Sequence, residues 1–299
     1  MTGLGALIKR NVKLYFKDKG MFFTSLITPA ILLILYSTFL GNVYEDSFRS
    51  ALTAAGAEVS DQVLWGCVGG QLVSSLLAVS CVTVAFCSNL LMVQDKVSGA
   101  RKDLTIAPLK SSTLALSYYL STLLSTLLIS FAATAVCLGY LACVGWFLTV
   151  ADIAALLLDV VLLVLFGTAL SSCINFPLST QGQGSAVGTI ISAGYGFICG
   201  AYMPISNFSP GLQKVISFLP GSYGTSLLRN HALRGVFAEM LEQGFPKEVV
   251  ESIRDSVDCN LYFFGTKVSQ GSMYGILLGS IVLLIAIYIV LNKVIKKRN

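Results

Sequence analysis

Residues 160–213 read VVLLVLFGTALSSCINFPLSTQGQGSAVGTIISAGYGFICGAYMPISNFSPGLQ and contain no Asp, Glu, Lys or Arg. A helix needs about 20 apolar residues to cross the core of a bilayer, so this stretch is too long for one span. Its middle, from Asn175 to Gly184, is a polar segment rich in Pro and Gly, which favours a turn. We therefore expect two membrane-spanning helices here, over residues 150–174 and 184–203.

Four further stretches without charged residues predict the other spans. They cover residues 20–44, 62–94, 111–151 and 268–292, and we place helices at 21–41, 62–91, 113–143 and 272–293. The second and third stretches are longer than a bilayer requires, so these helices either tilt or continue beyond the membrane. The sequence thus predicts an all-α polytopic membrane protein with six transmembrane helices.

The composition supports this class. Of the 299 residues, 55% are apolar and 12% are charged, and the mean hydropathy is +0.78. Soluble domains carry about 25% charged residues, so a soluble enzyme, a disordered chain and a nucleic-acid-binding protein are excluded, and the lipid bilayer is the expected surroundings. The first apolar stretch exceeds the roughly 7–15 residues of a signal-peptide core, so we expect it to be retained.

Seven of the eight cysteines lie in apolar stretches, where cysteine behaves as a small hydrophobic residue. The sequence has no Cys-x-x-Cys pair and one histidine, so it predicts no metal site. Cys259 lies in a polar region. A free thiol and a disulfide to Cys67 or to a second subunit are both open.

The distribution of Lys and Arg predicts the orientation. With six spans, thirteen of the twenty basic residues fall on one side, in the N-terminal segment, the loop after the second span and the C-terminal tail. Basic residues mark the cytoplasmic side, so both termini are expected in the cytoplasm of a protein of the plasma membrane.

Amphipathic helices are predicted on both sides. Residues 1–20 form a basic interfacial helix with Arg10, Lys13 and Lys17 at helical spacing, which either anchors to anionic headgroups or contacts a cytoplasmic partner. Residues 204–271 form an outer helical cap, in which Ser209-Pro210 and Pro246 begin short helices.

Small residues recur every four positions in two of the predicted spans. The second span carries Gly66, Gly70, Ser74 and Ala78, and the fifth carries Gly184, Gly188, Ser192, Gly196 and Gly200. Such ridges let helix backbones approach closely in lipid. Fixed helix packing and a seam that opens along a translocation path or between two subunits are both compatible with this pattern.

Two acidic residues, Asp152 and Asp159, are seven apart on one face of the fourth span. Asp152 is expected at the outer interface, with Asp159 about two turns deeper as an intramembrane acid. Buried acids usually face a cavity or a partner, so Asp159 contacts either a cation or substrate, or a Ser, Thr or Asn of a neighbouring span. His231 is predicted to be a surface residue.

No catalytic constellation and no GxxxxGK[ST] phosphate loop are present, so we expect neither catalytic residues nor an ATP site of that kind in this chain. The loop at residues 94–109 mixes charges with a glycine and ends in an apolar turn and a proline, which predicts a short cytoplasmic helix.

This order of features resembles the ABC-2 type permeases, the membrane subunits of ABC exporters. Asp95, Lys96, Gly99, Leu104 and Pro108 match the family's cytoplasmic turn. The segment from Met203-Pro204 through Leu219-Pro220 to Arg229 resembles the family's outer segment. Asp95 stands where Glu is commoner, and Ala100 stands where Thr often follows the glycine.

The resemblance implies a mechanism. Two permeases, as a homodimer or heterodimer, would pair with two ABC ATPase subunits, which bind ATP and Mg²⁺, while this chain holds no cofactor. Spans two and five would flank a path for a drug, an antimicrobial peptide or a lipid-linked molecule. The turn would be a coupling helix seated in the ATPase, and its residues would be Asp95, Lys96, Gly99, Arg101, Lys102, Leu104 and Pro108.

Two other classes of membrane protein are alternatives to an exporter subunit. An ion-coupled secondary transporter or channel would use Asp159, but a single deep acid is a thin basis for ion coupling. A membrane enzyme acting on lipids would need a cluster of His, Asp and Glu, which the sequence does not contain.

Overall fold

The computed structural model describes residues 3–54, 60–106 and 110–296, and within them the chain is helical apart from one short hairpin. In chain order the elements are α1 (Leu4–Lys17), α2 (Lys19–Leu35), the π-helix η1 (Tyr36–Leu40), α3 (Gly41–Ala54), α4 (Asp61–Asn89), α5 (Leu91–Val97), α6 (Ala100–Ile106), α7 (Ser111–Val144), α8 (Val150–Asn175), α9 (Gln181–Ile198), the 3₁₀ turn η2 (Ile205–Asn207), α10 (Pro210–Ile216), α11 (Pro220–Glu242), α12 (Lys247–Ser256), β1 (Tyr262–Phe263), β2 (Thr266–Lys267) and α13 (Gln270–Lys296).

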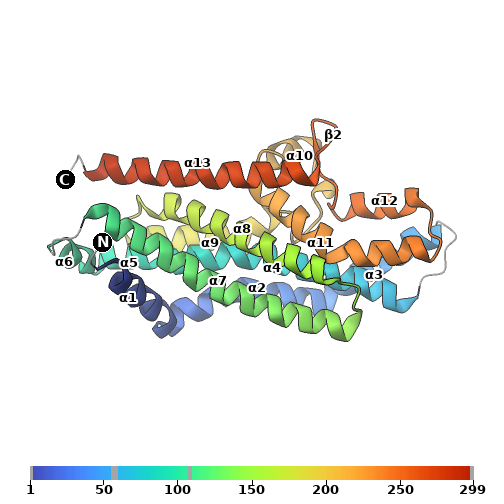
Figure 1. Cartoon of the computed structure of the whole chain (residues 1–299), viewed down its shortest axis with the longest axis horizontal. Coiled ribbons are helices and arrows are strands. Elements are labelled where there is room, and N and C mark those ends of the chain that lie inside the picture. Colours follow the sequence, from blue (N-terminus) through green and yellow to red (C-terminus); the bar gives the residue numbers. More distant parts are fainter. Residues whose placement is uncertain (1–2, 55–59, 107–109, 297–299) are drawn as a thin grey trace.

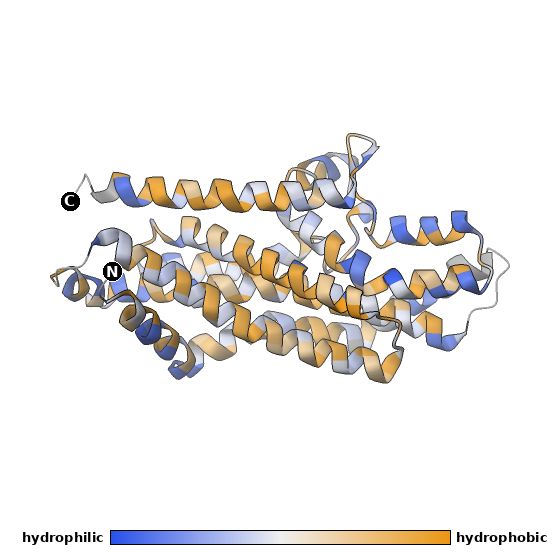
Figure 2. Ribbon diagram, viewed as in Figure 1, coloured by the Kyte–Doolittle hydropathy of each residue, from blue (hydrophilic) through white to orange (hydrophobic). Residues whose placement is uncertain are grey.

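The long helices lie side by side and define two ends of the molecule. Figure 1 shows α1, α5, α6 and the last turns of α13 at one end, called here the α6 end, and α3 and α12 at the other, called the α12 end. Figure 2 shows that hydrophobic residues dominate the middle of the long helices, while hydrophilic residues gather on α1, α6 and α12. This is the pattern of a bundle that crosses a bilayer.

Five helical segments are long and apolar enough to cross a membrane: Lys19–Ser50, Asp61–Val97, Ser111–Val144, Val150–Asn175 and Gln270–Val294. They coincide with the predicted spans one, two, three, four and six. The helix α9 has 18 residues and is not among the five, because its glycines and polar residues dilute its apolar content. The predicted fifth span therefore remains a prediction, and α9 ends at Ile198, before the expected end at residue 203.

The first span is longer than the sequence indicates. After α2 the chain passes through one π-helical turn and continues as α3 to Ala54, well past the predicted end at residue 41. The extension is amphipathic, and Arg49 pairs with Glu45 one turn away at 2.9 Å on its polar side. The charged residues thus mark the end of the apolar part of the span, while the helix itself continues.

The helix α4 forms the centre of the bundle. It is buried along almost its whole length and packs against α2, α7, α8, α9 and α11. A helix that is surrounded by other helices needs no polar face, and α4 accordingly has apolar or small residues on all sides, with Gln71 and Asn89 as its buried amides.

Residues 204–271 contain two helices that the sequence predicted and a third that it did not. The helices α10 and α12 begin at Pro210 and directly after Pro246, as predicted. Between them lies α11, a 23-residue helix that packs between α4 and α8. The sequence of α11 shows no apolar periodicity, because several of the side chains that face the bundle are polar and pair with acids of other elements.

Candidate functional site

An open groove with a volume of about 1400 Å³ separates α2 from α9. It runs from Asp18 and Gln181 at one end to Asn207 and Val257 at the other. Its walls are formed mainly by apolar and hydroxyl side chains, which include Met21, Thr24, Thr28, Ile31, Phe39, Tyr44, Phe48, Gly184, Gly188, Ser192, Tyr202, Met203 and Pro204. Of its lining residues Asp18 alone is charged, so this α2–α9 groove suits a largely apolar occupant.

The ridge on α9 faces this groove for part of its length. Gly184, Gly188 and Ser192 line the groove. A Cβ on Gly188 would have Leu90 as its nearest neighbour, at 3.8 Å. A Cβ on Gly196 would instead meet the ring of Tyr202 at 2.3 Å, so that glycine makes room for Tyr202. Gly200 lies beyond the end of α9, where its φ of +75° turns the chain.

The ridge on α4 is filled from within the same chain. A Cβ on Gly66 would meet Phe147 at 2.7 Å, and one on Gly70 would meet Leu233 of α11 at 2.4 Å. Ser74 and Ala78 are also buried. The two ridges are alike in sequence but have different surroundings. The ridge on α4 packs against α11, whereas the ridge on α9 borders the groove.

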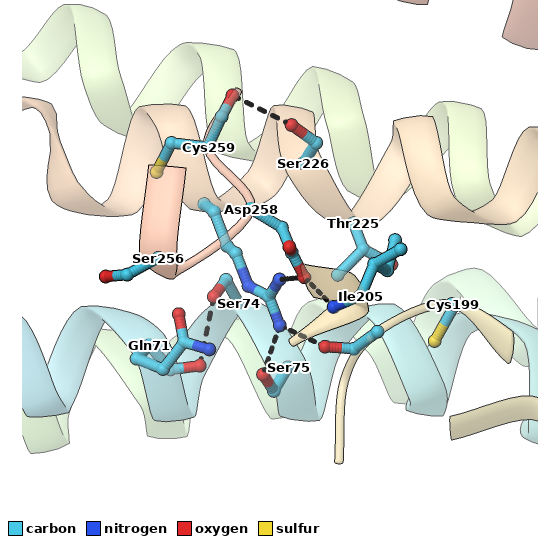
Figure 3. A network of polar contacts seen from close by, with 12 residues as sticks. Gln71, Ser74, Ser75, Cys199, Ile205, Thr225, Ser226, Ser256, Asp258 and Cys259 are labelled. Atoms are coloured by element: carbon cyan, nitrogen blue, oxygen red, sulfur yellow. Dashed lines mark hydrogen bonds and ion pairs between the residues drawn. The ribbon is translucent and has the colours of Figure 1, made fainter. Parts of the chain in front are cut away.

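A buried guanidinium lies behind the end of the groove at the α12 end. Arg229 of α11 has no exposed surface, and its Nη1 donates to Asp258 Oδ2 at 3.0 Å. Its Nη2 donates to Ser75 Oγ of α4 at 3.3 Å and to the Gly200 carbonyl (Figure 3). Burial raises the pKa of the Asp258 carboxyl, and the charge of Arg229 opposes that shift. The Arg229 side chain therefore contacts three segments that lie far apart in the sequence.

His231 is not on the surface, and that prediction was wrong. It is 8% exposed, and its Nδ1 lies 2.6 Å from Asp159 Oδ2, while Tyr274 of α13 donates to Asp159 Oδ1 at 2.7 Å. The side chains that contact Asp159 are thus His231 and Tyr274, and not the Ser, Thr or Asn of a neighbouring span that the sequence suggested. The prediction failed because α11, which carries His231, was not recognised as a buried helix.

Asp152 has a similar arrangement at the start of α8. It caps the helix with Thr149, and its Oδ1 lies 2.6 Å from Arg234 Nε of α11. The seven-residue spacing of Asp152 and Asp159 thus turns both acids toward basic residues of α11. Among the described residues no group of three or more His, Cys, Asp or Glu is placed to hold a metal ion.

The turn at the α6 end is held by buried polar contacts. Asp95, which is 5% exposed, accepts two hydrogen bonds from Arg10 of α1, at 2.7 and 3.0 Å, and one from Tyr118 of α7 at 2.6 Å. The hydrogen bond to Asp95 raises the pKa of Arg10. A bidentate Arg–carboxylate pair fixes direction as well as distance, so α1 is clamped to the end of α5.

Lys96 contacts the segment that follows α8. Its Nζ donates to the carbonyls of Phe176 and Leu178, directly after α8, and it lies 5.4 Å from the centre of the Phe176 ring. The guanidinium of Arg101 lies 5.7 Å from the same ring. Gly99, with φ +83°, separates α5 from α6. The predicted single helix over residues 94–109 is therefore two short helices with a break at this glycine.

The residues of the turn divide into an inner and an outer group. Asp95 and Lys96 face the bundle, and Leu104 packs beside the buried cluster around Tyr118. Lys102, Asp103 and Thr105 are exposed, and Ile106 is 84% exposed. Pro108 lies outside the described residues. Lys102, Asp103, Thr105 and Ile106 thus form the outward-facing side of this turn.

Comparison with known proteins identifies one family. The family model described as "ABC-2 type transporter" matches residues 2–232, which is more than half of the chain. No curated protein matches this chain.

Proposed function

Because the chain belongs to the ABC-2 type transporter family, we propose that it is the membrane subunit of an exporter driven by a separate ATPase. It is a multi-pass membrane permease, and such permease domains lack an ATP-binding site. They generally pair with ABC ATPase subunits, which hydrolyse the ATP. In our proposal two copies of this chain, as a homodimer, assemble with two ATPase subunits that bind ATP and Mg²⁺.

The observation that carries the proposal is the construction of the α5–α6 turn. Its inner group, Asp95 and Lys96, connects the turn to α1, α7 and the end of α8. Its outer group presents Lys102 and Ile106 to the surroundings. A force applied to the outer group is thereby passed to several helices at once, as coupling to an ATPase requires. The α6 end and both termini are then cytoplasmic, in agreement with the excess of basic residues.

The α2–α9 groove supports the position of the transport path. A second copy that covers the open side of the groove would enclose a space lined by apolar and hydroxyl groups. Such a lining suits a drug, an antimicrobial peptide or a lipid-linked molecule, because each offers apolar surface to bury.

Reversing the outer group tests the coupling. We expect the double variant Lys102→Glu, Ile106→Asp to insert and fold normally but to lose the ATPase subunit, because the changed side chains face outward. Co-purification with the ATPase and ATP-driven export in vesicles measure this. The matched control is Lys293→Glu, the same charge reversal on an exposed residue at the α6 end of α13. Normal co-purification and export by the double variant would contradict the assignment of the coupling turn.

The alternative function, ion-coupled transport through Asp159, finds less support. Both carboxylate oxygens of Asp159 already have protein partners, the residue has no exposed surface, and it does not line the groove. A cation would have to displace His231 and Tyr274.

We expect Asp159→Asn to lower the free energy of unfolding by about 1–3 kcal/mol, the usual cost of leaving buried polar groups imperfectly paired. Export per folded transporter should stay driven by ATP. Thermal unfolding and export with and without an imposed ion gradient provide the measurement. If a proton or sodium gradient drives export and this variant abolishes it, the ion-coupled function is correct instead.

A further inference from the structure

Both walls of the α2–α9 groove are connected to Arg229 at the α12 end. The α9 wall is connected through the turn that follows that helix. Arg229 donates to the Gly200 carbonyl, and Asp258, which Arg229 holds, accepts a hydrogen bond from the Ile205 backbone N–H at 2.8 Å (Figure 3). Between these two anchored residues lie Tyr202, Met203 and Pro204, all of which line the groove.

The α2 wall reaches the same guanidinium through α4. Ser75 accepts hydrogen bonds from Arg229 at 3.3 Å and from the Tyr36 hydroxyl at 3.4 Å. Tyr36 belongs to the π-helical turn and stacks on Tyr44, with ring centres 5.6 Å apart, and Tyr44 lines the groove. Single π-turns inside α-helices are frequent at functional sites.

A second acceptor for the guanidinium lies next to the first. Gln71 is on α4 one turn before Ser75, hence on the same face. It has no exposed surface, and neither its Oε1 nor its Nε2 has a hydrogen-bond partner in the described structure. Arg229 Nε also has none. Buried polar atoms without partners are rare in proteins, and here Gln71 Oε1 is an unused acceptor one helical turn from Ser75, which accepts from Arg229.

We propose that Arg229 is a positioning residue that holds the outer end of the groove closed, and that opening transfers one of its hydrogen bonds from the Gly200 carbonyl to Gln71 Oε1. This inference rests on the proposed function, because it takes the groove as the transport path. The Arg229–Asp258 pair stays intact in both states, so no charge is left unpaired in the interior. The turn at residues 200–205 is the part that moves.

The test measures access to the groove from outside. Met203→Cys is made in a Cys87→Ser, Cys143→Ser background, since Cys143 is exposed and Cys87 lines the groove. The complete transporter, permease with ATPase, is labelled with a membrane-impermeant maleimide. Cys259 is buried, which keeps its thiol out of reach of the maleimide and raises its pKa. With Arg229 unchanged, we expect slow labelling without ATP and fast labelling during turnover.

Arg229→Lys should make labelling without ATP about tenfold faster or more, because a hydrogen bond to a charged group shifts an equilibrium by at least roughly that factor. Lysine keeps the charge for Asp258 but cannot also reach Ser75 and the Gly200 carbonyl. Gln71→Leu should have the opposite effect and suppress the fast labelling during turnover.

Arg234→Lys is the matched control. It lies on the same helix and pairs with Asp152, but it does not line the groove, so labelling should not change. If Arg229→Lys does not assemble, Ile205→Pro replaces it. This change removes the N–H that Asp258 accepts and leaves Arg229 in place, and proline suits the first position of a helical turn.

The proposal fails if assembled Arg229→Lys or Ile205→Pro transporters label at the parent rate, because Arg229 would then serve the fold alone. It also fails if Arg234→Lys accelerates labelling equally, which would indicate general loosening. Export is assayed on the same preparations. Absence of ATP-driven export in the parent would reject the exporter function, whereas the labelling without ATP tests the closure separately.

Discussion

Replacing Asp95 with alanine is expected to abolish ATP-driven export and to lower the free energy of unfolding by roughly 3 kcal/mol, the lower end of the range for a broken buried ion pair. The lower end applies because Arg10 is partly exposed. The variant leaves Arg10 and Tyr118 without their shared acceptor. Helix α1 is then no longer clamped to the turn. Thermal unfolding of the purified permease and export by the full transporter measure the two effects.

Two controls separate the clamp from the charge. Tyr118→Phe removes one hydrogen bond and keeps the Arg10–Asp95 pair, so it should retain export. Arg49→Ala removes an exposed pair on α3 near the other end of the molecule, and neither stability nor export should change measurably. If Asp95→Ala exports at the parent rate, the turn transmits force without α1.

The second large effect distinguishes the two glycine ridges. Gly70→Leu should prevent α11 from packing on α4, because even a Cβ there would lie 2.4 Å from Leu233 and 3.2 Å from the Ala232 carbonyl. Overpacking a core costs about 1–3 kcal/mol, occasionally more, and here it also displaces the helix that carries Arg229 and His231. We expect loss of folded protein, measured by size-exclusion chromatography and thermal unfolding.

Gly188→Leu is the counterpart on α9. Its nearest neighbour would be Leu90 at 3.8 Å, and the side chain would extend into the groove. We expect normal folding with export reduced at least several-fold. Gly194→Leu, on the same helix with no atom within 4 Å of the added Cβ and outside the groove lining, should fold normally and export at the parent rate. Unchanged export by Gly188→Leu would place the path elsewhere.

Much of the architecture was predictable because a bilayer imposes one simple requirement. Spans one to four and six were found from long stretches with few or no charges, since a helix in lipid pairs its own backbone polar groups and needs apolar side chains over a known length. Pro210 and Pro246 marked helix starts, because proline fits the first turn of a helix and disrupts its interior.

The buried polar residues were not predictable in the same way. The sequence predicted His231 to be a surface residue and indicated no partner for Arg229 or Arg234. Their partners, Asp258, Asp159 and Asp152, are brought to them by folding. A possible signal was the presence of two acids in span four, since such acids require partners. It did not say which residues those partners were.

By itself the sequence determined the membrane class, five of the spans, the short helices α10 and α12 and a charged turn between spans two and three, because each follows from local composition. Tertiary structure alone decided which of two similar ridges is filled and which borders open space. It also decided that α11 is buried and that Arg229 joins both walls of the groove. The reason is physical: a glycine ridge or a basic side chain specifies that something must approach closely, while the identity of that neighbour depends on how distant segments pack.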